Sequence, residues 1–360
     1  MTDSSRKFNR RLYVLLSIAL SIFVILFFIL YIVVLFFRGF LFTNDSYKNY
    51  VNGGVYWSNS GSMSPCGEYL VFSSPKSGRG DIWRLRLSDS TMRRMTDTET
   101  FESYPQYSPN GKSIFYTREW KGHRHIWKMD KDGQAHEQLT FDRTNDTLLD
   151  ISSDGDSLMI GRCYYAGGKG MAVTPAMIYS VSDKKVTGEN IGSSGFFLDN
   201  HTLLYNTGRY GSPRFGKYDL ATRQRHEFGS GFIKCLSPNK KTILIARDAS
   251  RSSFLNDELF LFDIDEQSEK HIGTGMYPCF VGDSKVVFFV HPSLDRAYVY
   301  SLESDTTDEI ELPGAILTEP TVVPDGRGAL LSLGNMNDAD RSGNIYLFDG
   351  NGIERLTQRQ

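Results

Sequence analysis

The feature of this 360-residue sequence that most constrains its fold is a turn motif that recurs about every 44 residues. Ser64-Pro65-Cys66-Gly67 returns as Ser108-Pro109-Asn110-Gly111, and weaker copies begin at residues 152, 197, 237, 281 and 323. A fixed period of 20–50 residues indicates structural units that each bury an apolar face against the next unit. We therefore expect one repeat architecture from the first turn to the last.

Each repeat contains the same series of apolar segments. The turn is followed by runs such as Leu70-Val71-Phe72 and Ile114-Phe115-Tyr116, which predict a strand buried on both faces. A second strand reads Asp81-Ile82-Trp83 or His125-Ile126-Trp127, and a third ends as in Leu139-Thr140. With a short strand before each turn, every repeat supplies four strands.

Four-stranded units at this period are typical of a β-propeller, in which each sheet is buried between its neighbours and circular closure removes open edges. We predict an all-β fold over residues 53–360, a seven-bladed β-propeller of four-stranded antiparallel blades. This prediction includes one transmembrane α-helix before the propeller.

The helix is predicted from residues 12–37, a run of 26 residues without a charge. Such a run is long enough to cross a bilayer, and it is longer than the apolar core of a cleavable signal peptide. Four basic residues precede it: Arg6, Lys7, Arg10 and Arg11. The positive-inside rule then places a cytoplasmic tail at 1–11, a signal anchor at 12–37, a linker at 38–52 and the propeller on the periplasmic or extracellular side.

The turn, the Asp/His-Ile-Trp strand and the final Leu-Thr together resemble the TolB-type propeller repeat, also described as PD40 or WD40-like, over about residues 60–357. The chain departs from periplasmic TolB itself, which has a separate α/β domain before its propeller and no retained membrane anchor. In that family the repeat is a scaffold, and its roles include protein docking. The resemblance implies a propeller strongly and a particular partner hardly at all.

Catalytic and metal-binding patterns are sparse. No G-x-S-x-G nucleophile motif is present, so we expect no serine hydrolase activity. His123 and His125 make a weak two-ligand metal site, and His125 also replaces Asp81 in the repeat. The run from Asp338 through Asp340 to Ser342 begins like a calcium loop, but the expected twelfth ligand falls in a predicted strand, which leaves calcium binding open. We predict no cofactor, no metal and no catalytic residue.

One rim of the propeller has a basic excess. The loops between the second and third strands of the repeats contain 13 basic and seven acidic residues, whereas residues 51–360 as a whole have a formal charge of −6. Arginine with tyrosine and tryptophan is enriched at binding surfaces. The predicted partner-binding residues of this rim are Arg118, Trp120, Lys121, His123, Arg124, Arg162, Tyr164, Tyr165, Arg209, Tyr210, Arg214 and Arg251. The alternative is that Arg118, Arg162 and Arg247, which share one repeat position, pair with carboxylates at the blade edges.

The function predicted from these patterns is a membrane-anchored, non-catalytic docking or scaffold module outside the cytoplasm. Its predicted partners are the membrane and an acidic protein or an anionic glycan, with no nucleic acid and no small-molecule cofactor. The overall charge of −2 supports the exclusion of nucleic acid. The alternative is a glycan-binding or glycan-active propeller that resembles oligogalacturonate lyase. The four cysteines have no CxxC spacing, and we expect them to be free or buried thiols.

Overall fold

The computed structural model describes residues 61–74, 80–163, 175–187, 190–207, 212–248, 256–334 and 343–357. All of them belong to the second of two compact units, Tyr56–Gln360, and the first unit is Met1–Val55. These described ranges contain 28 β-strands and no helix, and so none that could cross a membrane. The helix expected at 12–37 lies outside the described residues.

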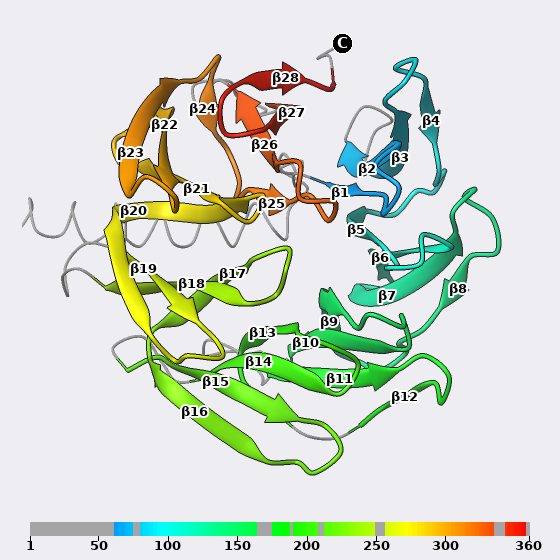
Figure 1. Cartoon of the computed structure of the whole chain (residues 1–360). Helices are drawn as coiled ribbons and strands as arrows, with labels where there is room; N and C mark the ends of the chain where they lie inside the picture. The colour runs from blue at the N-terminus through cyan, green and yellow to red at the C-terminus, as the bar shows by residue number, and fades with distance from the viewer. Residues whose placement is uncertain are drawn as a thin grey trace, which may run out of the picture. The chain divides into compact units, whose positions relative to one another are not determined.

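The first three sheets each contain four antiparallel strands in chain order (Figure 1). Their strands are β1 (Ser62–Met63), β2 (Tyr69–Ser74), β3 (Asp81–Arg86), β4 (Met92–Arg94), β5 (Glu102–Tyr107), β6 (Ser113–Trp120), β7 (His123–Asp130), β8 (Glu137–Gln138), β9 (Asn145–Ile151), β10 (Ser157–Cys163), β11 (Ala176–Ser180) and β12 (Lys185–Val186). The first strand of each sheet lies nearest the centre of the ring and the fourth at its outer edge.

A fourth four-stranded sheet and a final five-stranded sheet flank one longer sheet. The fourth sheet contains β13 (Ser194–Phe197), β14 (Thr202–Thr207), β15 (Arg214–Asp219) and β16 (Arg225–Ser230). The longer sheet contains β17 (Phe232–Leu236), β18 (Thr242–Asp248), β19 (Asp257–Asp263), β20 (Glu269–Val281), β21 (Lys285–Val290), β22 (Ser293–Ser301) and β23 (Thr306–Glu311). The final sheet contains β24 (Ala315–Ile316), β25 (Thr321–Val322), β26 (Ala329–Gly334), β27 (Gly343–Phe348) and β28 (Ile353–Arg355).

The prediction of seven separate four-stranded blades is wrong. Hydrogen bonding among the described strands gives five separate blades of four or five strands and one continuous seven-stranded sheet. The cause is β20, whose first half pairs with β19 and whose second half pairs with β21. Because this strand has no break, the fifth and sixth repeats share one sheet. The pairing register shifts between Met276 and Cys279, where Tyr277 has a φ of 52°, as at a β-bulge.

The recurrent Ser-Pro turn owes its sequence to one local hydrogen bond. The hydroxyl of Ser108 accepts a hydrogen bond from the backbone amide of Ser113 at 3.0 Å. The hydroxyls of Ser152 and Ser237 accept equivalent bonds from the amides of Ser157 and Thr242. The turn also needs a positive φ at its fourth position, which glycine adopts without strain; Gly111 has a φ of 67°. The motif is therefore a structural device of the fold.

The closing Leu-Thr of the repeat has an equally local role. The hydroxyl of Thr140 accepts the buried amide of Ile126 at 3.0 Å, so it ties the end of the outer strand back to β7. Thr96 and Thr357 accept the amides of Ile82 and Ile345 in the same way, at 2.9 and 2.8 Å. Buried amides must be paired, and this explains why the motif recurs.

The core lies between neighbouring sheets. Val71 and Ile82 of the first sheet pack with Ile114 and Tyr116 of the second, and all four side chains are fully buried. Burial of one such side chain contributes about 1.5–3 kcal/mol. No single sheet can bury both of its faces alone, so the blades are stable only together.

The first and last sheets pack against each other and close the ring. Met63 and Leu70 share an apolar cluster with Leu330 and Ile345. The Arg327 guanidinium also donates a hydrogen bond to the carbonyl of Gly67. No described strand of the last sheet pairs with the first, so closure rests on packing and this polar contact.

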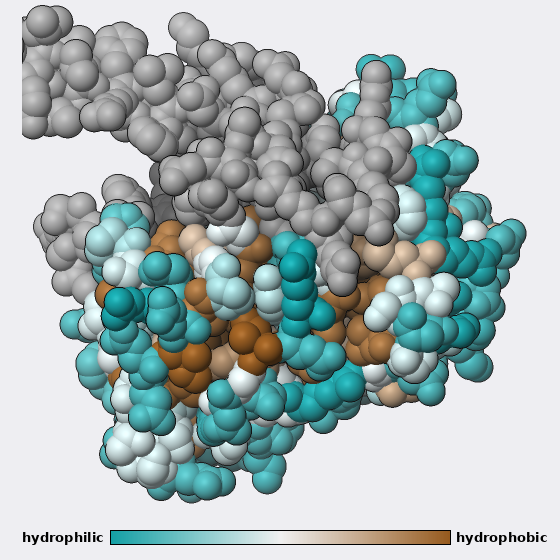
Figure 2. Space-filling view, turned by 90° about the horizontal axis from the view of Figure 1, so that it is seen from above, coloured by the Kyte–Doolittle hydropathy of each residue, from teal (hydrophilic) through white to brown (hydrophobic). Residues whose placement is uncertain are grey.

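One side of the propeller shows hydrophobic residues gathered in its middle, with hydrophilic residues around them (Figure 2). Apolar atoms at the surface are common in folded proteins.

Candidate functional site

The candidate site is the part of the rim formed by the end of β6, the start of β7 and the loop before β9. We call residues 119–122 the β6–β7 tip. Trp120 and His123 are the last cross-strand pair, joined by Lys121 and Gly122. Both turn residues have a positive φ, 52° and 79°, as a two-residue hairpin turn requires. A Cβ placed on Gly122 would meet no atom within 4 Å, so the tip projects into open space.

Trp120 is the aromatic residue of this tip. It is 40% exposed, and among the described residues only Phe141 is a comparably exposed large hydrophobic side chain. The guanidinium of Arg118 lies 5.6 Å from the centre of the Trp120 ring, and the Lys121 ammonium lies 5.7 Å from it. Cations within about 6 Å of an indole are attracted to its face. Two cations therefore lie close to this ring at the surface.

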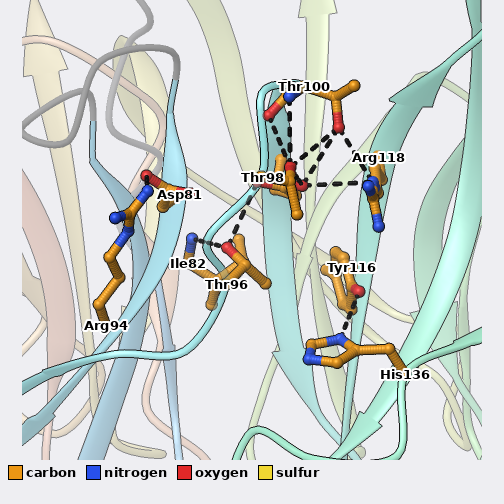
Figure 3. Close-up of polar contacts among 10 residues, drawn as sticks. Asp81, Ile82, Arg94, Thr96, Thr98, Thr100, Tyr116, Arg118 and His136 are labelled. Atoms are coloured by element: carbon orange, nitrogen blue, oxygen red, sulfur yellow. Dashed lines mark hydrogen bonds and ion pairs between the residues drawn. The ribbon is translucent and has the colours of Figure 1, made fainter.

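Arg118 itself is used within the protein. Its Nε donates to the hydroxyl of Thr100 at 2.9 Å and lies 3.4 Å from the carboxylate of Glu102. The guanidinium also lies 4.7 Å from the centre of the Trp127 ring. Figure 3 shows Arg118 directed at the loop that carries Thr98 and Thr100. Arg118 therefore orients Trp120 and is not available to a partner.

The fully buried Glu102 lies beneath this loop. It accepts hydrogen bonds from the hydroxyls of Thr96, Thr98 and Thr100. Burial raises the pKa of Glu102 to about 7, because its charged form loses hydration, whereas the Thr98 hydrogen bond and the Arg118 charge oppose the shift. This carboxyl can gain or lose a proton near neutral pH, but it does not reach the surface.

Arg162 forms the second internal ion pair of the rim. Its side chain is 7% exposed, and it binds Asp146 through Nε at 2.8 Å and Nη2 at 3.0 Å. Nη1 binds Asp142 at 2.7 Å, so the same arginine anchors the loop before β9. Two parallel N–H donors fit one carboxylate, which makes this a charge-assisted structural contact.

The alternative expectation for the arginines at this repeat position is confirmed. Arg118 pairs with Glu102 and Arg162 with Asp146, as described above. Arg247 binds both carboxylate oxygens of Glu269, at 3.0 and 2.6 Å. The first two pairs join neighbouring strands, whereas Arg247 on β18 reaches past β19 to the start of β20.

The remaining described rim residues lie in different settings. The exposed side chain of Arg214 pairs with Glu227. The backbone amide of Arg124 donates to the Asn145 side chain at 2.8 Å, which brings β7 to the start of β9. The His123 ring centre lies 6.3 Å from that of His125. The other predicted rim residues lie outside the described ranges: Tyr164, Tyr165, Arg209, Tyr210 and Arg251.

Metal ligands do not gather in the part of the chain that the structure describes. No group of three or more His, Cys, Asp or Glu side chains there could hold a metal ion. The loop with Asp338, Asp340 and Ser342 lies outside the described residues. Burial lowers the pKa of His125, so its ring favours the neutral form.

Phe141 is a rim residue that the sequence analysis missed. It is 71% exposed and directly follows the Leu139-Thr140 that ends the second repeat. The next residue, Asp142, is fixed by Arg162. The sequence could have indicated this exposed residue, because an aromatic residue follows the Leu-Thr motif at a position where the repeat needs no core side chain. Together, Trp120 and Phe141 give this rim two exposed aromatic rings.

Comparison with known proteins shows similarity to one protein family over part of the chain. The family described as TolB beta propeller domain (PD40) matches residues 46–166. An uncharacterized protein of Agrobacterium fabrum is 26% identical over 104 residues, and this match spans 29% of the chain and 34% of that relative.

Solved structures at low sequence identity share the fold. An oligogalacturonate lyase in complex with manganese has a TM-score of 0.62 at 10% identity, over 81% of this chain and 87% of that one. The acylaminoacyl peptidase of Pyrococcus horikoshii has 0.60 at 13%, over 84% and 53%. The propeller domain of the Trilobed protease of Pyrococcus furiosus has 0.58 at 15%, over 84% and 96%.

The fold and these likenesses define the class as a β-propeller. Over residues 46–166, about a third of the chain, the sequence is similar to the TolB beta propeller domain family.

Proposed function

We propose that this protein is a membrane-anchored docking module whose propeller binds an acidic protein partner through the rim of its second repeat. The observation that carries the proposal is Trp120, which is 40% exposed at a projecting hairpin tip and lies close to two cations. Tryptophan and arginine dominate the energetics of protein interfaces. A structural role alone would not require the ring to be exposed.

The charge around Trp120 supports an acidic partner. Asp142 and Asp146 are engaged by Arg162, and Glu102 lies buried beside Arg118. The exposed charged side chains next to the two aromatic rings are Lys121, Arg143, Glu119 and Asp142, and of these Asp142 is paired with Arg162. Complementary charge at an interface raises the association rate and selects among partners.

A binding experiment with defined probes tests the docking surface. The full-length chain in detergent micelles is titrated into a fluorescein-labelled polyglutamate peptide, and anisotropy reports binding. The double variant Trp120→Ala, Lys121→Glu should bind at least about ten-fold more weakly, the effect of losing one interface hot spot. The matched control Lys112→Glu reverses an exposed charge in the turn directly before β6, at the end opposite the tip, and should change the affinity less than about two-fold.

Equal weakening by both variants would contradict the rim as the docking surface. A second arm uses a fluorescein-labelled oligogalacturonate of matched charge. A tryptophan beside cations also suits an anionic sugar, and the fold is shared with an oligogalacturonate lyase. Binding of the glycan but not of the peptide would replace the protein partner with a glycan.

The anchor is tested separately. The proposal predicts that the full-length chain stays in the membrane fraction after alkaline carbonate extraction, and that deletion of residues 12–37 releases it. The exposed Cys66 gives the orientation. In intact spheroplasts a membrane-impermeant maleimide should label the chain, and Cys66→Ser should lower this labelling. No labelling before lysis would contradict a propeller outside the cytoplasm.

A further inference from the structure

Two cysteines occupy the same repeat position on neighbouring inner strands. Cys235 lies on β17, two residues before the turn that begins at Ser237, and Cys279 lies on β20, two residues before Val281. The side chains belong to one apolar cluster and are 7% and 1% exposed. Their Sγ atoms are 4.0 Å apart.

At this repeat position the other inner strands show what the side chain does. The hydroxyl of Ser62 accepts the amide of Tyr107 at 3.2 Å, and the carboxylate of Asp150 accepts the amide of Phe197 at 2.6 Å. In both cases a polar side chain ties one inner strand to the next repeat. The position therefore faces the neighbouring strand.

The cysteines have no comparable tie in the thiol form. Apart from their mutual contact, Cys235 lies 3.8 Å from the carbonyl of Leu236, and Cys279 lies 3.6 Å from that of Phe280. Thiols are weak hydrogen-bond donors, so these contacts hold the strands less firmly than an oxygen acceptor would. The surroundings include the apolar side chains of Leu244, Val287 and Phe288.

We propose that Cys235 and Cys279 form a disulfide that links the inner strands of the fifth and sixth repeats when the protein meets an oxidising thiol–disulfide environment. A disulfide needs an Sγ–Sγ distance of about 2.05 Å, so the two sulfurs must approach by about 2 Å. Rotation about the two Cα–Cβ bonds supplies movements of that size.

Oxidised glutathione is a suitable disulfide oxidant, and the exchange balances. The Cys235 thiolate attacks one sulfur of the oxidant and releases one glutathione thiolate, leaving a mixed disulfide. The Cys279 thiolate then attacks Sγ of Cys235 and releases the second glutathione. Two electrons and the two thiol protons pass to the oxidant, which becomes two molecules of reduced glutathione. Both thiols are buried, so the oxidant reaches them when the structure opens locally, and we expect the more exposed Cys235 to react first.

The test maps the bond in the full-length chain. The protein in detergent micelles is incubated with oxidised glutathione or with dithiothreitol, unfolded in guanidinium chloride with N-ethylmaleimide, and digested without reduction. Mass spectrometry should find the Cys235 and Cys279 peptides joined in the oxidised sample and alkylated in the reduced sample. The oxidised protein should melt at least about 5 °C higher, because the bond closes a loop of more than 40 residues.

Three variants separate the bond from other effects. Cys66→Ser should keep the joined peptide, since Cys66 is exposed and lies in the turn of the first repeat, away from the fifth and sixth repeats. Cys235→Ala and Cys279→Ala should each abolish it and the rise in melting temperature. Both thiols alkylated after oxidation, a bond to Cys66 or Cys163 instead, or a joined peptide without the rise would each overturn the proposal. These readouts do not depend on binding at the Trp120 rim.

Discussion

At the scale of single residues, the hydroxyl of Thr140 decides whether a buried amide keeps its partner. Replacement by valine keeps the shape but leaves the amide of Ile126 unpaired inside the protein. We predict that Thr140→Val lowers the free energy of unfolding by about 1–3 kcal/mol. Denaturant unfolding followed by tryptophan fluorescence measures the change.

The control for this prediction is Thr307→Val on β23, where the side chain is exposed. It should stay within about 0.5 kcal/mol of the parent. Similar losses from both variants would show that the Thr140 hydrogen bond is not what the repeat motif preserves.

Glu102 should make stability depend on pH. Its pKa of about 7 in the folded protein lies above its ordinary value of 4.5, so the folded state binds the proton more tightly than the unfolded state does. The resulting stabilisation is complete below pH 4.5 and is lost as pH rises through 7. The full difference is about 3 kcal/mol.

The variant Glu102→Gln removes this titration. We predict that stability between pH 5 and 8 falls less steeply in the variant than in the parent. Asp150 keeps part of the slope, because burial raises its pKa to about 6. Thermal unfolding across this pH range measures both slopes, and parallel curves would contradict the assignment.

At the scale of elements, Arg162 holds β10, β9 and the preceding loop together. Arg162→Ala leaves Asp146 buried without its cation, so we predict a loss of about 3 kcal/mol or more in the free energy of unfolding. Arg214→Ala removes an exposed pair and should leave the melting temperature unchanged within error. Equal effects would mean that the two rim arginines do not differ in role.

The elements also show which parts of the fold can be predicted from the sequence. The Ser-Pro turns, the apolar strands and the Leu-Thr ends lie where the repeat placed them, because each depends on contacts within a few residues. The unbroken β20 was not predictable, since Gly273 and Gly275 suggest a break between repeats. The division of the last repeat's inner strand into β24 and β25 was also not predicted. Pro320, which has no amide hydrogen, lies between the two strands.

The candidate site was predictable in part for the same reason. The shared repeat position of Arg118, Arg162 and Arg247 was visible in the sequence. Their partners were not, because Glu102 and Asp146 come from inner strands whose starts vary between repeats. Exposure of Phe141 depends on how the loop before β9 is anchored, which a single sequence does not state.

At the scale of the whole molecule, a closed propeller carries one projecting hairpin tip on its rim. The first and last sheets share a buried cluster, so the ring is one cooperative unit that can present the β6–β7 tip rigidly. A site on a rigid element loses little conformational entropy on binding. The central claim is that partners dock at this tip.

Site-specific photo-cross-linking tests this claim most directly. A photoreactive phenylalanine analogue replaces Trp120 in one full-length protein and Lys112, in the turn directly before β6, in another. The account predicts an adduct in membranes from position 120 that is lost with Lys121→Glu, and none from position 112. Adducts of equal yield at both positions, or none at position 120, would contradict it.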